Sequence, residues 1–152
     1  AKRVAEEEEL WSAIGLLHDF DYEAYPDEHP QKGAVILKER GYPDDFIQTI
    51  LSHATYTGVP RDTDCARWLF AVDELTGFLT ACALVRPDKS IAEVKVKSVN
   101  KKLKDKAFAQ GVNRDDVLNG AAELGVDLGE HIEFVRDAMA TIADELELPP
   151  RS

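Results

Sequence analysis

The chain has 152 residues, of which 44% are hydrophobic, and it carries a formal net charge of −11 at pH 7. This length favours a single domain with a core large enough to fold without disulfide or metal staples. The negative charge disfavours binding to nucleic acid or to an anionic membrane. Its two cysteines, Cys65 and Cys82, lack the spacing of a metal knuckle and favour a reduced, cytoplasmic setting.

Helical periodicity recurs along the chain and predicts an all-α fold. Apolar residues at helical spacing predict helices over 3–17, 31–40, 44–53 and from Asp62 or Thr63 to Leu84. Further helical segments are predicted over 90–95, 98–110, 114–124 and 128–146. The alternation in 94–97 is too short, between helix-like segments, to predict a strand. We expect one helical domain over 1–152, and one that is N-terminally incomplete, because the chain enters helix-like sequence directly and without Met.

The apolar segment 68–85 contains an unexpected carboxylate, Asp73. Asp73 and its neighbour Glu74 argue against a membrane span and favour a buried core helix. An ionised carboxylate in a core costs several kcal/mol unless it is paired or bound to a metal. Asp73 is therefore interpreted as a metal ligand, and the alternatives are a surface acid or a salt bridge to Arg67 or Lys89.

Three of the four histidines precede Asp73, and the first of them forms the pair His18-Asp19 after an apolar helical run. On a regular helix these two side chains point about 100° apart, so they reach one ion only where the helix ends. His29 in a loop could also be a surface histidine, and His53 could serve only to stabilise a helix C-terminus. Imidazole nitrogens with carboxylate oxygens suit a first-row divalent metal.

The predicted metal site is therefore His18, Asp19, His29, His53 and Asp73, while His131 is interpreted as structural or exposed. Residues 86–106 hold eight Lys or Arg against three acids, a local charge of +5 on an acidic chain. That strip is either a solvated helix face or a patch facing a substrate phosphate. Nucleic-acid binding is the least favoured reading, because aromatic residues are not interleaved with these cations.

The order of these motifs resembles the HD-domain superfamily of metal-dependent phosphohydrolases. In that pattern a His-Asp doublet, here similar to His18-Asp19, is followed by two optional histidines, similar to His29 and His53. The distal aspartate of the pattern is similar to Asp73. The stretches 18–23, 25–30, 73–78 and 85–90 together resemble a bacterial subgroup of HD hydrolases. The resemblance implies an HD-like compact helical bundle.

Two features depart from the family pattern. No histidine precedes His18, so the early-helix ligand of the family lies upstream of Ala1 or is missing. Asp21-Tyr22 stands where many members carry Gly-Lys, which removes a phosphate-binding lysine. That charge would then come from Lys32, Lys89 or the later basic strip, which includes Lys95 and Lys97.

The resemblance implies metal-assisted hydrolysis of a phosphate ester in a nucleotide or another phosphorylated small molecule. One or two ions of Mn, Fe, Co, Ni or Zn suit the ligand set, with Asp19 bridging if two are bound. Asp21 or Glu23 would act as general base or orient the attacking water. The alternative is an HD fold that binds a metal or nucleotide without turnover and serves as a sensor or homo-oligomerisation module.

Overall fold

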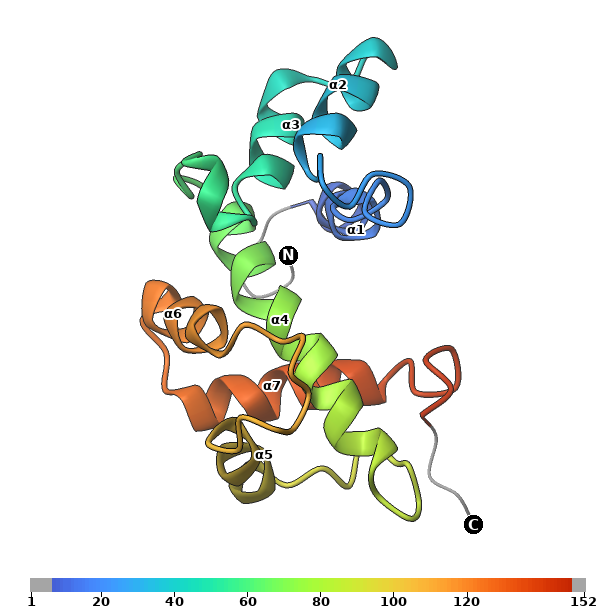
Figure 1. The fold of residues 1–152 in the computed structure, drawn as a ribbon, viewed down its shortest axis with the longest axis vertical. Helices are drawn as coiled ribbons and strands as arrows, with labels where there is room; N and C mark the ends of the chain where they lie inside the picture. The colour runs from blue at the N-terminus through green and yellow to red at the C-terminus, as the bar shows by residue number, and fades with distance from the viewer. Residues whose placement is uncertain (1–6, 149–152) are drawn as a thin grey trace. The chain divides into compact units, whose positions relative to one another are not determined.

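The computed structural model describes residues 7–148, and every regular element within that range is helical (Figure 1). The elements are α1 (Glu8–Leu17), α2 (Gln31–Glu39), α3 (Asp44–Leu51), the 3-10 turn η1 (Thr55–Thr57), α4 (Asp64–Leu84), α5 (Val96–Leu103), α6 (Arg114–Leu124) and α7 (Leu128–Ala140). The all-α prediction is confirmed. None of the helices in the described range is long and apolar enough to cross a membrane.

The chain divides after Phe70 into two compact units. Helix α4 contributes to both, residues 64–70 to the first unit and 71–84 to the second. Each unit has its own apolar core. That residues 1–152 fold as a single domain stays a prediction.

The first unit packs α1 and α2 against α3. Helix α3 turns an apolar face inward, because Phe46, Ile47 and Ile50 recur at helical spacing and are all buried. Ile14 of α1, Leu37 of α2 and Leu69 of α4 complete this core. Since the three helices share one core, the segments at their ends are held in fixed positions. Those segments carry three of the four histidines.

The second unit packs α5 and α6 against α7, around a core that includes Leu75, Phe78 and Leu79 of α4. Gly120 of α6 lies so close to α4 that an added Cβ would come within 2.6 Å of the Ala71 Cα. His131 is also buried, and its Nε2 lies 2.9 Å from the carbonyl oxygen of Ala71. This contact fits the structural interpretation of His131.

The start of α4 agrees with the sequence prediction, because a capping side chain defines it. Thr63, one of the two predicted N-caps of α4, accepts a hydrogen bond at its Oγ1 from the Ala66 N–H at 3.1 Å. The prediction of helix from residue 3 falls partly outside the described residues, within which α1 begins at Glu8.

Of the helical predictions in the second unit, one was wrong altogether and two were wrong in extent. Residues 90–95 contain no helix: a bend and a turn lie at 91–93, just after the point where the Asp88 carboxylate accepts from the Ser90 N–H at 3.1 Å. Helix α5 spans Val96–Leu103 instead of 98–110, because the guanidinium of Arg114 binds the carbonyls of Asp105 and Phe108. Helix α7 ends at Ala140, six residues before the predicted end at 146, and turns follow it.

Candidate metal centre

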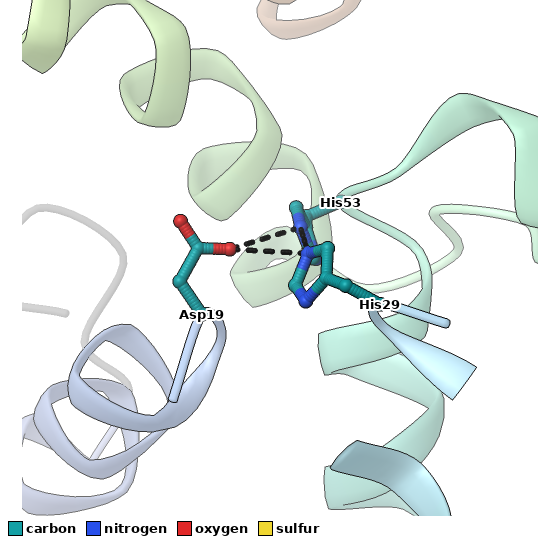
Figure 2. Close-up of side chains that lie close together, drawn as sticks. All are labelled: Asp19, His29 and His53. Atoms are coloured by element: carbon teal, nitrogen blue, oxygen red, sulfur yellow. Dashed lines mark hydrogen bonds and ion pairs between the residues drawn. The ribbon is translucent and has the colours of Figure 1, made fainter. Parts of the chain in front are cut away.

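Three helix ends of the first unit supply the side chains of one site (Figure 2). Asp19 follows the C-cap of α1, which is His18. His29 lies just before Pro30, the residue that precedes α2, and His53 follows the C-cap of α3. Figure 2 shows the side chains of Asp19, His29 and His53 pointing toward one another.

The atoms that meet are suited to ligate a metal. Asp19 Oδ1 lies 3.2 Å from His29 Nε2 and 3.5 Å from His53 Nε2. The two Nε2 atoms are 3.3 Å apart. The two imidazoles are buried, whereas the Asp19 side chain is 48% exposed. The centre therefore has a rigid nitrogen side and an oxygen side that is open to solvent.

The hydrogen bonds behind the rings fix which nitrogen is available. His53 Nδ1 lies 2.5 Å from the carbonyl oxygen of Ile50, which can only accept, so this Nδ1 donates. His29 Nδ1 lies 2.7 Å from the carboxylate of Asp21 and donates in the same way. In a neutral ring the Nε2 then carries a lone pair. Two lone pairs and a carboxylate oxygen converge on one point, and only a cation or a proton relieves their repulsion.

His18 faces the other carboxylate oxygen of Asp19. Its Nδ1 lies 2.7 Å from the carbonyl oxygen of Gly15, and its Nε2 lies 3.3 Å from Asp19 Oδ2. The neighbouring imidazoles, His18 foremost and His53 after it, hold the pKa of the Asp19 carboxyl well below its ordinary value. Asp19 is thus an ionised carboxylate whose Oδ2 faces His18 and whose Oδ1 faces His29 and His53.

The sequence comparison agrees with this geometry. Residues 1–77, half of the chain, match the family model described as HD domain. The chain belongs to the HD-domain family. The matched region includes every residue of the predicted ligand set, and the divalent metals that HD domains bind fit the donors of the Asp19 centre. Comparisons with curated proteins and with solved structures gave no match.

Asp21 of this HD domain lies behind His29, on the side away from the centre. It is 2% exposed, and its two oxygens contact His29 Nδ1 at 2.7 Å and the Gly33 N–H at 2.6 Å. Glu23 is exposed two residues later. The general-base function proposed for either acid stays a prediction, but both Asp21 oxygens already accept hydrogen bonds. The sequence pattern identified Asp21 as a site residue but did not identify its partner Gly33. Gly33 contributes a backbone N–H and has no side chain that would suggest a functional residue.

An open cleft of about 660 Å³ borders the centre of the HD domain at His29. Its lining residues are Pro26, Asp27, Glu28, His29, Gln31, Lys32, Val35 and Tyr56. Lys32 extends over the Tyr25 ring with its Nζ 5.2 Å from the centroid, and the Tyr56 hydroxyl donates to the His29 carbonyl at 2.5 Å. The cleft therefore offers a cation and a hydroxyl beside a candidate metal ligand.

The remaining predicted site residues belong to the second unit. Asp73 is a half-buried residue of α4, and its backbone carbonyl accepts from the Thr76 hydroxyl at 2.8 Å. Lys89 lies in a turn with a φ of 51°, while the exposed Lys95 and Lys97 flank the start of α5. That Asp73 completes the metal set, and that these lysines bind phosphate, stay predictions. The proposed partner Arg67 contacts Asp64 at 2.5 Å.

Proposed function

We propose that this HD-domain protein is a metal-dependent phosphohydrolase that acts on a nucleotide or another phosphorylated small molecule. The observation that supports it most is the convergence of the His29 and His53 Nε2 atoms with Asp19 Oδ1. Membership of the HD family adds to it. The matched region, residues 1–77, contains all three of these side chains.

Asp19, His29 and His53 would hold one divalent ion, and His18, with Asp73, would supply a second position across the Asp19 carboxylate. Mn, Fe, Co, Ni and Zn all accept imidazole and carboxylate ligands. When bound, such an ion acts as a Lewis acid that lowers the pKa of water and neutralises charge on phosphate oxygens. The Nδ1 hydrogen bonds of the two buried rings keep their Nε2 atoms aimed at one point.

The other groups of the first unit would bind and orient the substrate. Lys32 would hold a phosphate oxygen in the cleft beside His29, where its ammonium offsets the negative charge of Asp27 and Glu28. Glu23, exposed on the same loop as Asp21, would accept the proton of the attacking water or orient it. Lys89, Lys95 and Lys97 would add positive charge if the second unit faces the substrate.

A screen of phosphomonoesters and of linear and cyclic nucleotides tests this function. The protein is stripped with a chelator, dialysed and then reconstituted separately with each of the five metals. We expect hydrolysis by at least one reconstituted form, its loss on adding EDTA, and its return with excess metal. Hydrolysis that persists in EDTA would contradict the metal mechanism.

The second candidate is a binding module without turnover. It is favoured by one sequence observation, Tyr22 in the place of the family lysine. Elemental analysis of the purified chain separates the two functions. Metal at one equivalent or more, with no hydrolysis of any compound in the screen, would support the binding module.

A further inference from the structure

Behind the metal-facing edge of His29, a buried carboxylate joins two donors from separate parts of the chain. Asp21 Oδ1 lies 2.7 Å from His29 Nδ1, and Asp21 Oδ2 accepts from the Gly33 N–H at 2.6 Å. Asp21 and His29 are both buried, at 2% and 8% exposure. No water is needed to satisfy either oxygen, so the three groups form a closed unit within the fold.

Gly33 reaches Asp21 because it lies in the first turn of α2. Backbone N–H groups in the first turn have no partner within the helix, and this helix has no side-chain cap of its own at Pro30. The Asp21 carboxylate supplies the missing acceptor, and the positive end of the helix dipole favours its negative charge. A Cβ on residue 33 would lie 2.8 Å from Asp21 Cγ and 2.9 Å from each oxygen, so only glycine leaves room for the contact.

We propose that Asp21 is a positioning residue, held by Gly33, that keeps the proton of His29 on Nδ1 and so leaves Nε2 open to the metal. This inference rests on the proposed metal centre and adds a function for two residues that do not touch the ion. A hydrogen-bonded carboxylate behind a ligating imidazole fixes the tautomer and ring orientation and raises the basicity of the ligand.

Only a carboxylate can serve both partners, because both of them donate. In Asp21→Asn, an amide oxygen turned to Gly33 leaves the amide NH₂ facing His29 Nδ1. That ring nitrogen must then accept, which moves the proton to Nε2 and blocks the ligand position. With the amide reversed, its NH₂ group and the Gly33 N–H face each other as two donors in a buried site, which is unfavourable.

The first test measures the His29 tautomer directly in the wild-type chain by ¹⁵N-resolved NMR of the imidazoles at pH 8. We expect His29 and His53 to carry their proton on Nδ1. His131 provides an internal reference of the opposite kind, because its Nε2 faces the Ala71 carbonyl oxygen. A wild-type His29 with its proton on Nε2 would overturn the inference, and this result does not depend on any variant folding or on any metal binding.

The second test compares Co²⁺ and Zn²⁺ affinities by calorimetry for the wild type, Asp21→Asn and the control Asp44→Asn. Asp44 is an exposed acid of the same unit, paired with Lys38 at 3.6 Å. We expect Asp21→Asn to bind about 10- to 100-fold more weakly, with a changed His29 tautomer, and Asp44→Asn to bind as the wild type does. Equal affinities of Asp21→Asn and the wild type would overturn the inference. A wild type that binds neither metal would instead overturn the proposed function.

Discussion

The Nε2 atoms of His29 and His53 lie 3.3 Å apart while the Nδ1 atom of each ring faces an oxygen acceptor. The acceptors come from different places, a side chain at Asp21 and the backbone carbonyl of Ile50. Both rings are thereby set with a lone pair toward Asp19. In the neutral form of both rings, the first unit thus presents the two Nε2 atoms as ligands for a metal.

Replacing Asp19 with Asn should weaken divalent metal binding by on the order of 100-fold or more. The change removes a negative charge that contacts His18, His29 and His53, while the side chain keeps its shape. Calorimetric titration with Zn²⁺ measures the effect, and thermal unfolding of the metal-free proteins checks that both fold. An Asp19→Asn variant that retains wild-type metal affinity would exclude Asp19 as a ligand.

Replacing Lys32 with Met should raise the KM for phosphorylated substrates by about 10-fold and leave metal affinity unchanged. Its ammonium lines the cleft beside His29 but makes no contact with the ligand atoms. The matched control is Lys38→Met on the same helix, where Lys38 pairs with Asp44 on the surface. Steady-state kinetics on the best substrate of the screen measures both. Equal KM values for the two variants would exclude Lys32 from substrate binding.

Cys82 should resist thiol reagents and should make stability sensitive to alkaline pH. It is 2% exposed, and burial raises the pKa of its thiol from 9.0 to about 11. The thiol of the unfolded chain therefore loses its proton at a lower pH than the thiol of the folded chain. The stability that the buried thiol contributes is fully present below pH 9.0 and is lost as the pH rises toward 11. Urea unfolding should show the wild type losing about 2 kcal/mol more than Cys82→Val over that interval. Unfolding free energies of the wild type and Cys82→Val that change in parallel with pH would contradict this prediction.

Gly120→Ala should destabilise the second unit by about 1–3 kcal/mol, because its new Cβ would meet the Ala71 backbone at 2.6 Å. Gly77→Ala is the matched control, since a Cβ there has no neighbour within 4 Å. That substitution should stabilise α4 by about 0.5–1 kcal/mol. Thermal unfolding of both variants provides the comparison, and a neutral Gly120→Ala would show that α6 can move away from α4.

The sequence was sufficient to predict the helical fold and to choose the side chains that meet at the centre. Asp19, His29 and His53 stand out because imidazoles are rare here and each lies at a predicted helix end. The position of Asp21 was not predictable, since it depends on an N–H twelve residues away and on the lack of a side chain at Gly33. A motif indicates which residue types form a site, but it does not indicate whether a carboxylate lies at the Nδ1 or the Nε2 edge of an imidazole.

Helix ends in the second unit were harder to predict for a similar reason. The guanidinium of Arg114 reaches back to the carbonyls of Asp105 and Phe108, a contact between residues that no local periodicity encodes. Asp88 likewise binds the N–H of Ser90 and starts a turn where apolar spacing favoured a helix. Such side-chain-to-backbone bonds compete with helix formation and override weak local propensity.

Anomalous diffraction from crystals of the Zn²⁺- or Co²⁺-loaded protein tests the central claim most directly. The account predicts a peak about 2.0–2.2 Å from Asp19 Oδ1, His29 Nε2 and His53 Nε2. Any second peak should lie on the His18 side of the Asp19 carboxylate. A fully loaded crystal whose peaks all lie away from these side chains would contradict the metal centre.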